Sequence, residues 1–148
     1  MFKKILCPVD FSETSLNASN NAIELAEQLK STITFIHVLD VNLMQNAGDL
    51  SFGSVDIYET LAEEEKGLLK KLDEIAVSKG VVVDTVLTHG VPQDIVLEKA
   101  KNENYELIVM GTHGRTGLSR VLLGSVAESL VRHSSLPVLL FRKQQTKN

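Results

Sequence analysis

The sequence predicts an α/β fold: a single-domain, open, doubly wound parallel sheet of five strands in the order 3-2-1-4-5, with helices on both faces. Short apolar runs rich in β-branched residues alternate with longer segments whose apolar residues recur at helical spacing. Such alternation favours parallel strands joined by right-handed crossovers. The 148-residue chain has the length of one domain and no internal repeat, so we expect a domain over residues 1–142 and a polar tail over 143–148.

The expected strands are short apolar runs that end in polar or glycine-containing loops. They cover residues 2–9, 32–39, 81–90, 105–111 and 135–142. The expected helices are the longer periodic segments between them. They cover residues 12–30, 56–79, 91–104 and a last helix to His133 that begins either near residue 118 or at Ser125.

Three residues mark the ends of these helices. Ser12 is a candidate N-cap, because its hydroxyl can accept a hydrogen bond from a free N–H group of the first turn. Gly80 is a natural C-terminal stop for the second helix. Pro92 lies near the first turn of the third helix, where a missing N–H group costs nothing.

Residues 40–55, DVNLMQNAGDLSFGSV, differ from the segments on either side. They are polar and small and have no sustained period, so we expect a long loop that becomes ordered over a ligand. The helix that follows is expected to expose the acidic run 63–65 to solvent. Its expected buried stripe consists of Ile57, Leu61, Leu68, Leu72 and Ile75.

Charge and cysteine content argue against several classes of protein. The net charge is -4 and the isoelectric point is about 5.5, whereas a protein that binds duplex nucleic acid needs a basic face. The single cysteine, Cys7, excludes an intramolecular disulfide, and its apolar surroundings favour a buried structural thiol. No run approaches the roughly 20 apolar residues of a membrane helix, and the N-terminus is not a signal peptide. We therefore expect a cytoplasmic protein without a nucleic-acid or membrane partner.

The fold class predicts where a ligand would bind. Open parallel sheets bind ligands at the carboxyl ends of their strands, where the strand order reverses. In this chain those ends are residues 8–10, 38–40, 89–91 and the loop that begins at Gly111. Three of them converge if the first, second and fourth strands are neighbours.

Residues 110–127, MGTHGRTGLSRVLLGSVA, could cradle a phosphate. Gly114 and Gly117 permit positive φ and close approach of the backbone to a ligand. The N-terminus of the following helix offers free N–H groups and a partial positive charge. Ser125 could add a hydroxyl, and Arg115 could reach a terminal phosphate. The string is neither GxxxxGK[ST] nor a clean GxGxxG, so spacing alone supports a phosphate site and an ordinary turn about equally.

The same stretch resembles the signature of the universal stress protein family: Gly, two residues, Gly, nine residues, Gly and then Ser or Thr. The matching positions are Gly111, Gly114, Gly124 and Ser125. ILCPVDFSETS is similar to the family's first strand and its Asp-containing loop, FIHVLD to its second strand, and LPVLLFR to its last strand. The resemblance spans nearly all of residues 1–142.

The complete glycine motif marks the ATP-binding branch of this family, so the resemblance implies a site for ATP, with Mg²⁺ carried by its phosphates. It implies that Asp10 lies near the nucleoside or its metal, that the backbone at Val38 binds the adenine edge, and that Met110 lies beneath the ribose and adenine. His113 would contact phosphates, whereas Ala127 cannot supply the hydroxyl that some members carry there. The implied binding residues are Pro8, Val9, Asp10, Val38, Met110, Gly111, His113, Gly114, Arg115, Gly124, Ser125, Val126 and Ala127.

The resemblance also implies a homodimer, because the family commonly pairs its last strands antiparallel across a two-fold axis. The residues that would form this edge are Val138, Leu139, Leu140 and Phe141. An unpaired apolar edge strand is an aggregation risk, so a partner strand there is physically favourable.

Some polar residues near the expected site have a structural interpretation as well. Asp10 could cap the helix that begins near Ser12. His37 lies inside an apolar strand and is more typical of a satisfied core histidine than of a ligand. His89 could line the pocket, but we expect no direct contact with a ligand. The histidines and Cys7 show no metal-ligand spacing.

Three functions remain open on the sequence alone. The first is a protein that binds ATP, hydrolyses it slowly or not at all, and changes its surface for an unknown downstream partner in a stress response. The second is an ATP hydrolase or phosphotransferase, but no residue is clearly placed to orient a water molecule; Glu128 follows the loop, and its direction is not set by the sequence. The third is a dimeric interaction module whose pocket is empty or holds another ligand.

Overall fold

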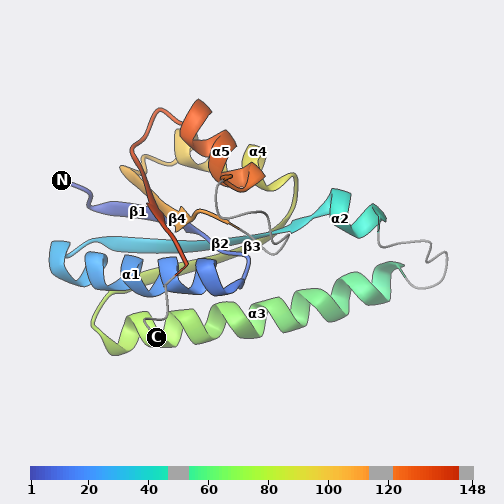
Figure 1. Cartoon of the computed structure of the whole chain (residues 1–148). Helices are drawn as coiled ribbons and strands as arrows, with labels where there is room; N and C mark the ends of the chain where they lie inside the picture. The colour runs from blue at the N-terminus through green and yellow to red at the C-terminus, as the bar shows by residue number, and fades with distance from the viewer. Residues whose placement is uncertain (47–53, 114–121, 144–148) are drawn as a thin grey trace, which may run out of the picture.

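Five strands form one parallel sheet with helices on both faces (Figure 1). The computed structural model describes residues 1–46, 54–113 and 122–143. The strand order is β3-β2-β1-β4-β5, and every neighbouring pair is parallel. The strands are β1 (Lys4–Pro8), β2 (Thr32–Asp40), β3 (Val82–Gly90), β4 (Leu107–Gly111) and β5 (Val138–Phe141). The predicted fold class and strand order are confirmed.

The helices divide into two layers (Figure 1). They are α1 (Glu13–Leu29), α2 (Val41–Asn46), α3 (Ser54–Ser78), α4 (Pro92–Asn102) and α5 (Ser125–His133). The first core cluster packs α1 and α3 on one face of the sheet, and the second packs α4 and α5 on the other. Successive side chains of β1 therefore enter different cores: Ile5 and Cys7 the first, and Leu6 the second. Burial raises the pKa of the Cys7 thiol to about 12, which makes it an inert core residue.

The predicted helix boundaries are largely confirmed. The hydroxyl of Ser12 accepts a hydrogen bond from the Ser15 N–H group, so Ser12 is the N-cap of α1. Gly80 follows α3 with a φ of +74°, a conformation that glycine adopts without strain. Pro92 begins α4, and α5 begins at Ser125, the later of its two predicted starts.

Two predictions about residues 40–79 were wrong. The expected loop contains a helix, α2, and α3 begins at Ser54; residues 47–53 lie outside the described residues. The buried stripe of α3 is also rotated relative to the prediction: Ile75 is 41% exposed, whereas Glu65 is buried. The buried residues recur at helical spacing, which explains the rotation. They are Ala62, Glu65, Leu69, Leu72 and Ala76.

The strand order reverses between β1 and β4, and these two strands share little of their length. β1 pairs with β2 from Lys4 to Pro8. Its register with β4 covers only Ile5 and Leu6. The carboxyl ends of β1 and β4 are thus not paired in register, which leaves a crevice at the place where this fold class binds ligands. Among the described helices, none has both the length and the apolar character needed to cross a membrane.

Candidate functional site

A cavity of about 370 Å³ lies at the carboxyl ends of β1, β2 and β4. Its volume is within the roughly 300–1,000 Å³ typical of small-molecule sites. The predicted binding residues that line it are Pro8, Val9, Asp10, Val38, Met110, Gly111, His113, Gly124, Ser125, Val126 and Ala127. Gly114 and Arg115 lie outside the described residues. The fold thus brings distant predicted residues to one cavity, while their contact with a ligand stays a prediction.

Asp10 supports the start of α1 and also lines the cavity. One of its carboxylate oxygens accepts a hydrogen bond from the Ser12 N–H group at 3.0 Å, and its own N–H group donates to the Ser15 hydroxyl at 3.0 Å. Asp10 thus orders the turn before α1, but the cap of this helix is Ser12 rather than Asp10. This structural contact does not exclude a ligand role. Ser15 is a cavity residue that the sequence analysis missed.

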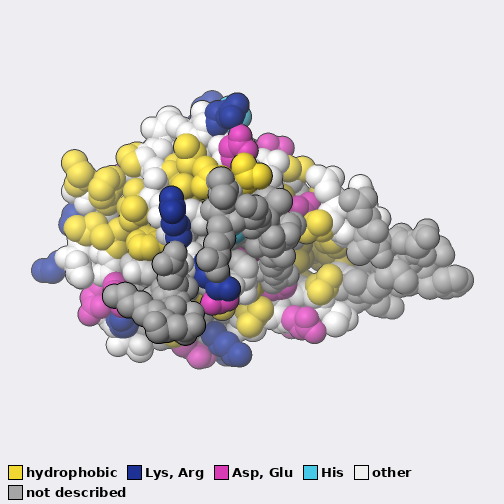
Figure 2. Space-filling model, in the orientation of Figure 1, with side chains coloured by type: hydrophobic (Ala, Val, Ile, Leu, Met, Phe, Trp, Pro, Cys, Tyr) yellow, Lys and Arg dark blue, Asp and Glu magenta, His cyan; other side chains and the backbone are white. Residues whose placement is uncertain are grey.

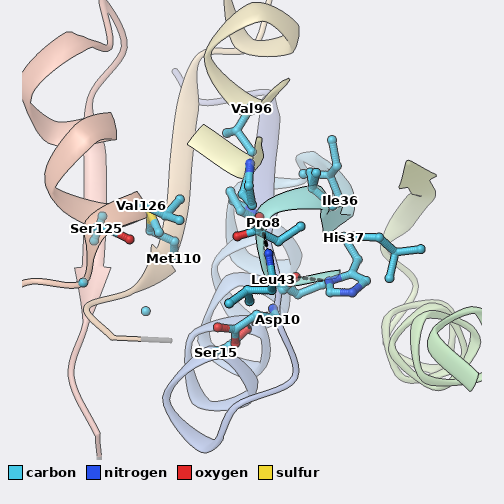
Figure 3. A pocket seen from close by; sticks show the side chains of 18 of the residues that line it. Pro8, Asp10, Ser15, Ile36, His37, Leu43, Val96, Met110, Ser125 and Val126 are labelled. Carbon is cyan, nitrogen blue, oxygen red and sulfur yellow. Dashed lines mark hydrogen bonds between the residues drawn. The ribbon is translucent and has the colours of Figure 1, made fainter. Parts of the chain in front are cut away.

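A buried pair of polar side chains, His37 and Glu65, lines the cavity on the side of α3 (Figure 3). His37 Nδ1 donates to the Val9 carbonyl at 2.7 Å, because a carbonyl can only accept. His37 Nε2 lies 3.7 Å from Glu65 Oε1, and the two side chains are 6% and 7% exposed. The ring of Phe11 packs 4.9 Å from the His37 ring. His37 is thus a satisfied core histidine, as expected, whereas the prediction that Glu65 faces solvent was wrong.

The opposite side of the cavity consists of the end of β4 and the start of α5 (Figure 3). Gly124 is the N-cap of α5, and the exposed Ser125 is its first residue. The first N–H groups of any helix have no partner within the helix, and they carry a partial positive charge. Ser125 and Val126 place this helix end against the cavity, with Met110 beside them.

Gly111 is required by packing between β4 and α1. A Cβ atom at this position would lie 2.9 Å from Thr14 Cγ2 and 3.1 Å from the Thr14 backbone. Side chains do not normally approach backbone so closely, so any larger residue would push β4 away from α1. At least one glycine of the motif therefore has a structural reason that is independent of any ligand.

His113 joins the two ends of the segment between Thr112 and Gly124, which we call the glycine loop. Its Nδ1 lies 2.8 Å from the Thr112 hydroxyl, and its Nε2 contacts the carbonyl of Leu122. Next to these contacts, the Gly124 N–H group donates to the Thr112 carbonyl at 2.8 Å. Residues 114–121 lie outside the described part of the chain, but the two ends that flank them are described.

The structure adds cavity residues that the sequence analysis did not name as binding residues, although three of them fall in the segment 40–55 that was expected to lie over a ligand. Leu43 and Met44 of α2 line the cavity, and Asp40 begins this helix by accepting hydrogen bonds from the N–H groups that follow it. The others include Ile36, Leu39, Leu61, Pro92, Val96 and Thr112. His89 is not among the described lining residues; its Nδ1 lies 3.4 Å from the Tyr58 hydroxyl.

The described residues contain no group of three or more His, Cys, Asp or Glu side chains that could hold a metal ion. The carboxylates that line the cavity belong to Asp10, Asp40 and Glu65. Glu128, the acidic residue after the loop, does not line the cavity; its carboxylate pairs with Arg132 at 2.9 Å on the exposed surface of α5.

Comparison with known proteins relates the whole chain to one family. Residues 1–142 match the model of the universal stress protein family. Universal stress protein MJ0531 from Methanocaldococcus jannaschii is 40% identical over 97% of this chain and 84% of its own length. The solved structure of protein MJ0577, which is from the same organism, superposes with a TM-score of 0.86 at 29% identity and covers 99% of both chains. A structure of a family member from Arabidopsis thaliana with AMP bound has a TM-score of 0.65, is 18% identical, and covers 96% of this chain and 92% of its own.

Proposed function

The chain belongs to the universal stress protein family, and from this premise we propose that its cavity binds an adenine nucleotide, with ATP as the preferred ligand. The proposal rests on one observation above all. The N-terminus of α5 opens into a cavity at the carboxyl ends of β1, β2 and β4, at the reversal of strand order. A helix N-terminus in this position offers N–H groups and positive potential to a phosphate. The relative with bound AMP has the same fold, which supports the proposal that this architecture can accommodate an adenine nucleotide.

The rest of the cavity suits a nucleoside. Its walls are mainly apolar: Ile36, Val96 and Met110 offer surfaces on which a base can pack. The backbone at the buried end of β2, near Val38, is the proposed partner of the adenine edge. Because the described residues provide no metal cluster, Mg²⁺ is proposed to enter with the phosphates, as this ion usually binds few protein groups.

Nucleotide binding is proposed to act through α2 as a switch in the stress response. Leu43 lines the cavity but is 54% exposed, so a ligand in the cavity would bury apolar surface on this short helix. If ligand binding made α2 more rigid, the surface that this helix offers to a downstream partner would change. Hydrogen exchange of α2 with and without ATP tests this step; equal protection in both states would rule α2 out as the switch.

We assign binding rather than rapid hydrolysis. Hydrolysis needs a group that orients the attacking water. Glu128, the sequence candidate, is paired with Arg132 outside the cavity. We therefore expect slow or absent ATP hydrolysis. The proposed location is the cytoplasm, where ATP and Mg²⁺ are present.

A homodimer through β5 completes the proposal. β5 is an edge strand, and its residue Leu139 is 39% exposed. Apolar side chains gather over the β5 and α5 side of the molecule in Figure 2. Pairing of two β5 strands would cover this edge. The molar mass from light scattering tests the dimer, and Leu139→Lys is expected to yield monomers.

The first experiment identifies nucleotide released on denaturing freshly purified protein and measures ATP binding with Mg²⁺ by calorimetry. Ser125→Asp is the matched variant: its charge suits a helix N-terminus but repels a phosphate, so ATP affinity should fall more than tenfold without loss of thermal stability. Ser129→Asp carries the same change within α5, at a position that does not line the cavity, and should bind like wild type. If no nucleotide is found and no heat is measured for the wild type, the proposal is wrong.

A further inference from the structure

The ends of the glycine loop are held to the sheet through one residue, Thr112. Its N–H group donates to the Phe141 carbonyl of β5 at 2.9 Å, and its carbonyl accepts from the Gly124 N–H group at 2.8 Å. Thr112 is buried. The N-cap of α5 is therefore tied to the sheet on one side of the loop.

His113 makes the second tie between the loop ends. A carbonyl oxygen only accepts, so His113 Nε2 must carry the proton that it shares with the Leu122 carbonyl. In the neutral ring Nδ1 is then an acceptor, and the Thr112 hydroxyl 2.8 Å away is its donor. Both ring nitrogens thus have partners within the protein, and these partners lie at opposite ends of the loop.

We propose that His113 is a positioning residue for the phosphate site rather than a phosphate ligand. By bonding to Thr112 and to Leu122, it fixes the chain that leads from Leu122 into Gly124 and the start of α5. This inference rests on the proposed function, because it assigns the α5 N-terminus to a phosphate. It differs from the role that the family resemblance implies for His113, which is contact with the phosphates themselves.

The physical basis is preorganisation. If the chain leading into α5 had to become ordered when a phosphate bound, the loss of conformational freedom would weaken binding. Leu122 and Gly124 are already held by His113 and Thr112, so the N–H groups at the start of α5 meet a phosphate at a smaller entropic cost. Only a ligand that carries phosphate is expected to benefit, since the proposed function places a phosphate, and not the adenosine moiety, at those groups.

The test compares ATP and adenosine, each with Mg²⁺, on the full chain. His113→Leu removes both ring contacts of His113 and leaves the backbone bonds of Thr112 in place. It is expected to weaken ATP binding about three- to tenfold while adenosine binding stays within about twofold. His113→Gln restores an N–H donor near the position of Nε2 and should recover most of the ATP affinity. The matched control is His133→Leu, because His133 lies exposed at the far end of α5, where its Nδ1 contacts the Ser129 carbonyl at 3.0 Å.

Hydrogen exchange in the nucleotide-free protein separates positioning from direct contact. Because the ties exist without a ligand, His113→Leu should speed exchange of the Gly124 amide measured by NMR. Weak ATP binding with unchanged Gly124 exchange would mean that His113 contacts phosphate directly and would overturn the proposal. Equal losses for ATP and adenosine, or no loss for either, would overturn it too. If the wild type binds neither ligand, the proposed function and the positioning role both fail, and the exchange rates report separately whether the ties exist.

Discussion

The two sides of the cavity differ in where their polar groups find partners. On the α3 side, which we call the His37 wall (His37 and Glu65), the histidine is bonded to a backbone carbonyl and faces a buried carboxylate. On the other side, which we call the α5 wall (Gly124, Ser125 and Val126), an exposed hydroxyl and the first N–H groups of a helix face the cavity. One cavity thus combines a wall whose polar groups stabilise the fold with a wall whose polar groups suit a ligand. Mutations on the two walls should therefore affect different quantities.

The largest expected effect is on the His37 wall. Glu65→Ala leaves His37 buried without its carboxylate, and removing one member of a buried pair costs about 3 kcal/mol of unfolding free energy. Urea unfolding measures this loss. Glu63→Ala is the control from the same acidic run: its side chain is 76% exposed, and its pair with Lys66 is worth less than about 0.5 kcal/mol. Similar small losses for both variants would contradict the buried role of Glu65.

Gly111→Ala tests whether a motif glycine next to the α5 wall is structural. The added Cβ atom would press against Thr14, so we expect a loss of about 2 kcal/mol in unfolding free energy. Gly67→Ala is the control, because nothing lies within 4 Å of a Cβ there and alanine favours the helix. The two variants should shift the melting temperature in opposite directions. A neutral Gly111→Ala would show that β4 and α1 can separate without cost.

Ser125→Ala probes the α5 wall directly. If the hydroxyl binds a phosphate oxygen, ATP affinity should fall about three- to tenfold, as for the loss of one hydrogen bond. The unfolding free energy should change by less than about 0.5 kcal/mol, because Ser125 is exposed and alanine is a good helix former. Calorimetry and urea unfolding measure the two quantities on the same sample. If Ser125→Ala lowered the unfolding free energy but left ATP affinity unchanged, the α5 wall would stabilise the fold as the His37 wall does, and the proposed difference between the two walls would be wrong.

The smallest expected effect is that of Glu128→Gln. Its surface pair with Arg132 contributes about 0.3–0.5 kcal/mol to stability. Because this carboxylate lies outside the cavity, any slow release of phosphate from ATP should continue at the wild-type rate. A phosphate-release assay checks this, and a clear drop in rate would assign Glu128 to catalysis and favour the hydrolase.

The sequence predicted the sheet because its signals are local and strong. Apolar runs such as residues 105–111 alternate with capped helices, and right-handed crossovers then leave few possible strand orders. The short helix α2 was missed because its six residues lie in a polar segment and cannot display a full amphipathic period.

Glu65 was missed for a different reason. Composition suggested that an acidic run faces solvent, whereas helical spacing from Leu69 and Leu72 places position 65 on the buried side. The helical spacing thus indicated that position 65 is buried, but the acidic residue type led to the opposite prediction. What no local pattern could supply was the partner, since His37 lies on a strand far away in the sequence and the pair forms only when the chain is folded.

The short register between β1 and β4 divides the sheet into two parts, the strands β3-β2-β1 and the strands β4-β5. The two parts are paired only through Ile5 and Leu6 of β1, and the cavity lies between them at the carboxyl ends of the strands. Val38 on β2 and Ser125, beside β4, both line this cavity, so a molecule that filled it would link the two parts of the sheet.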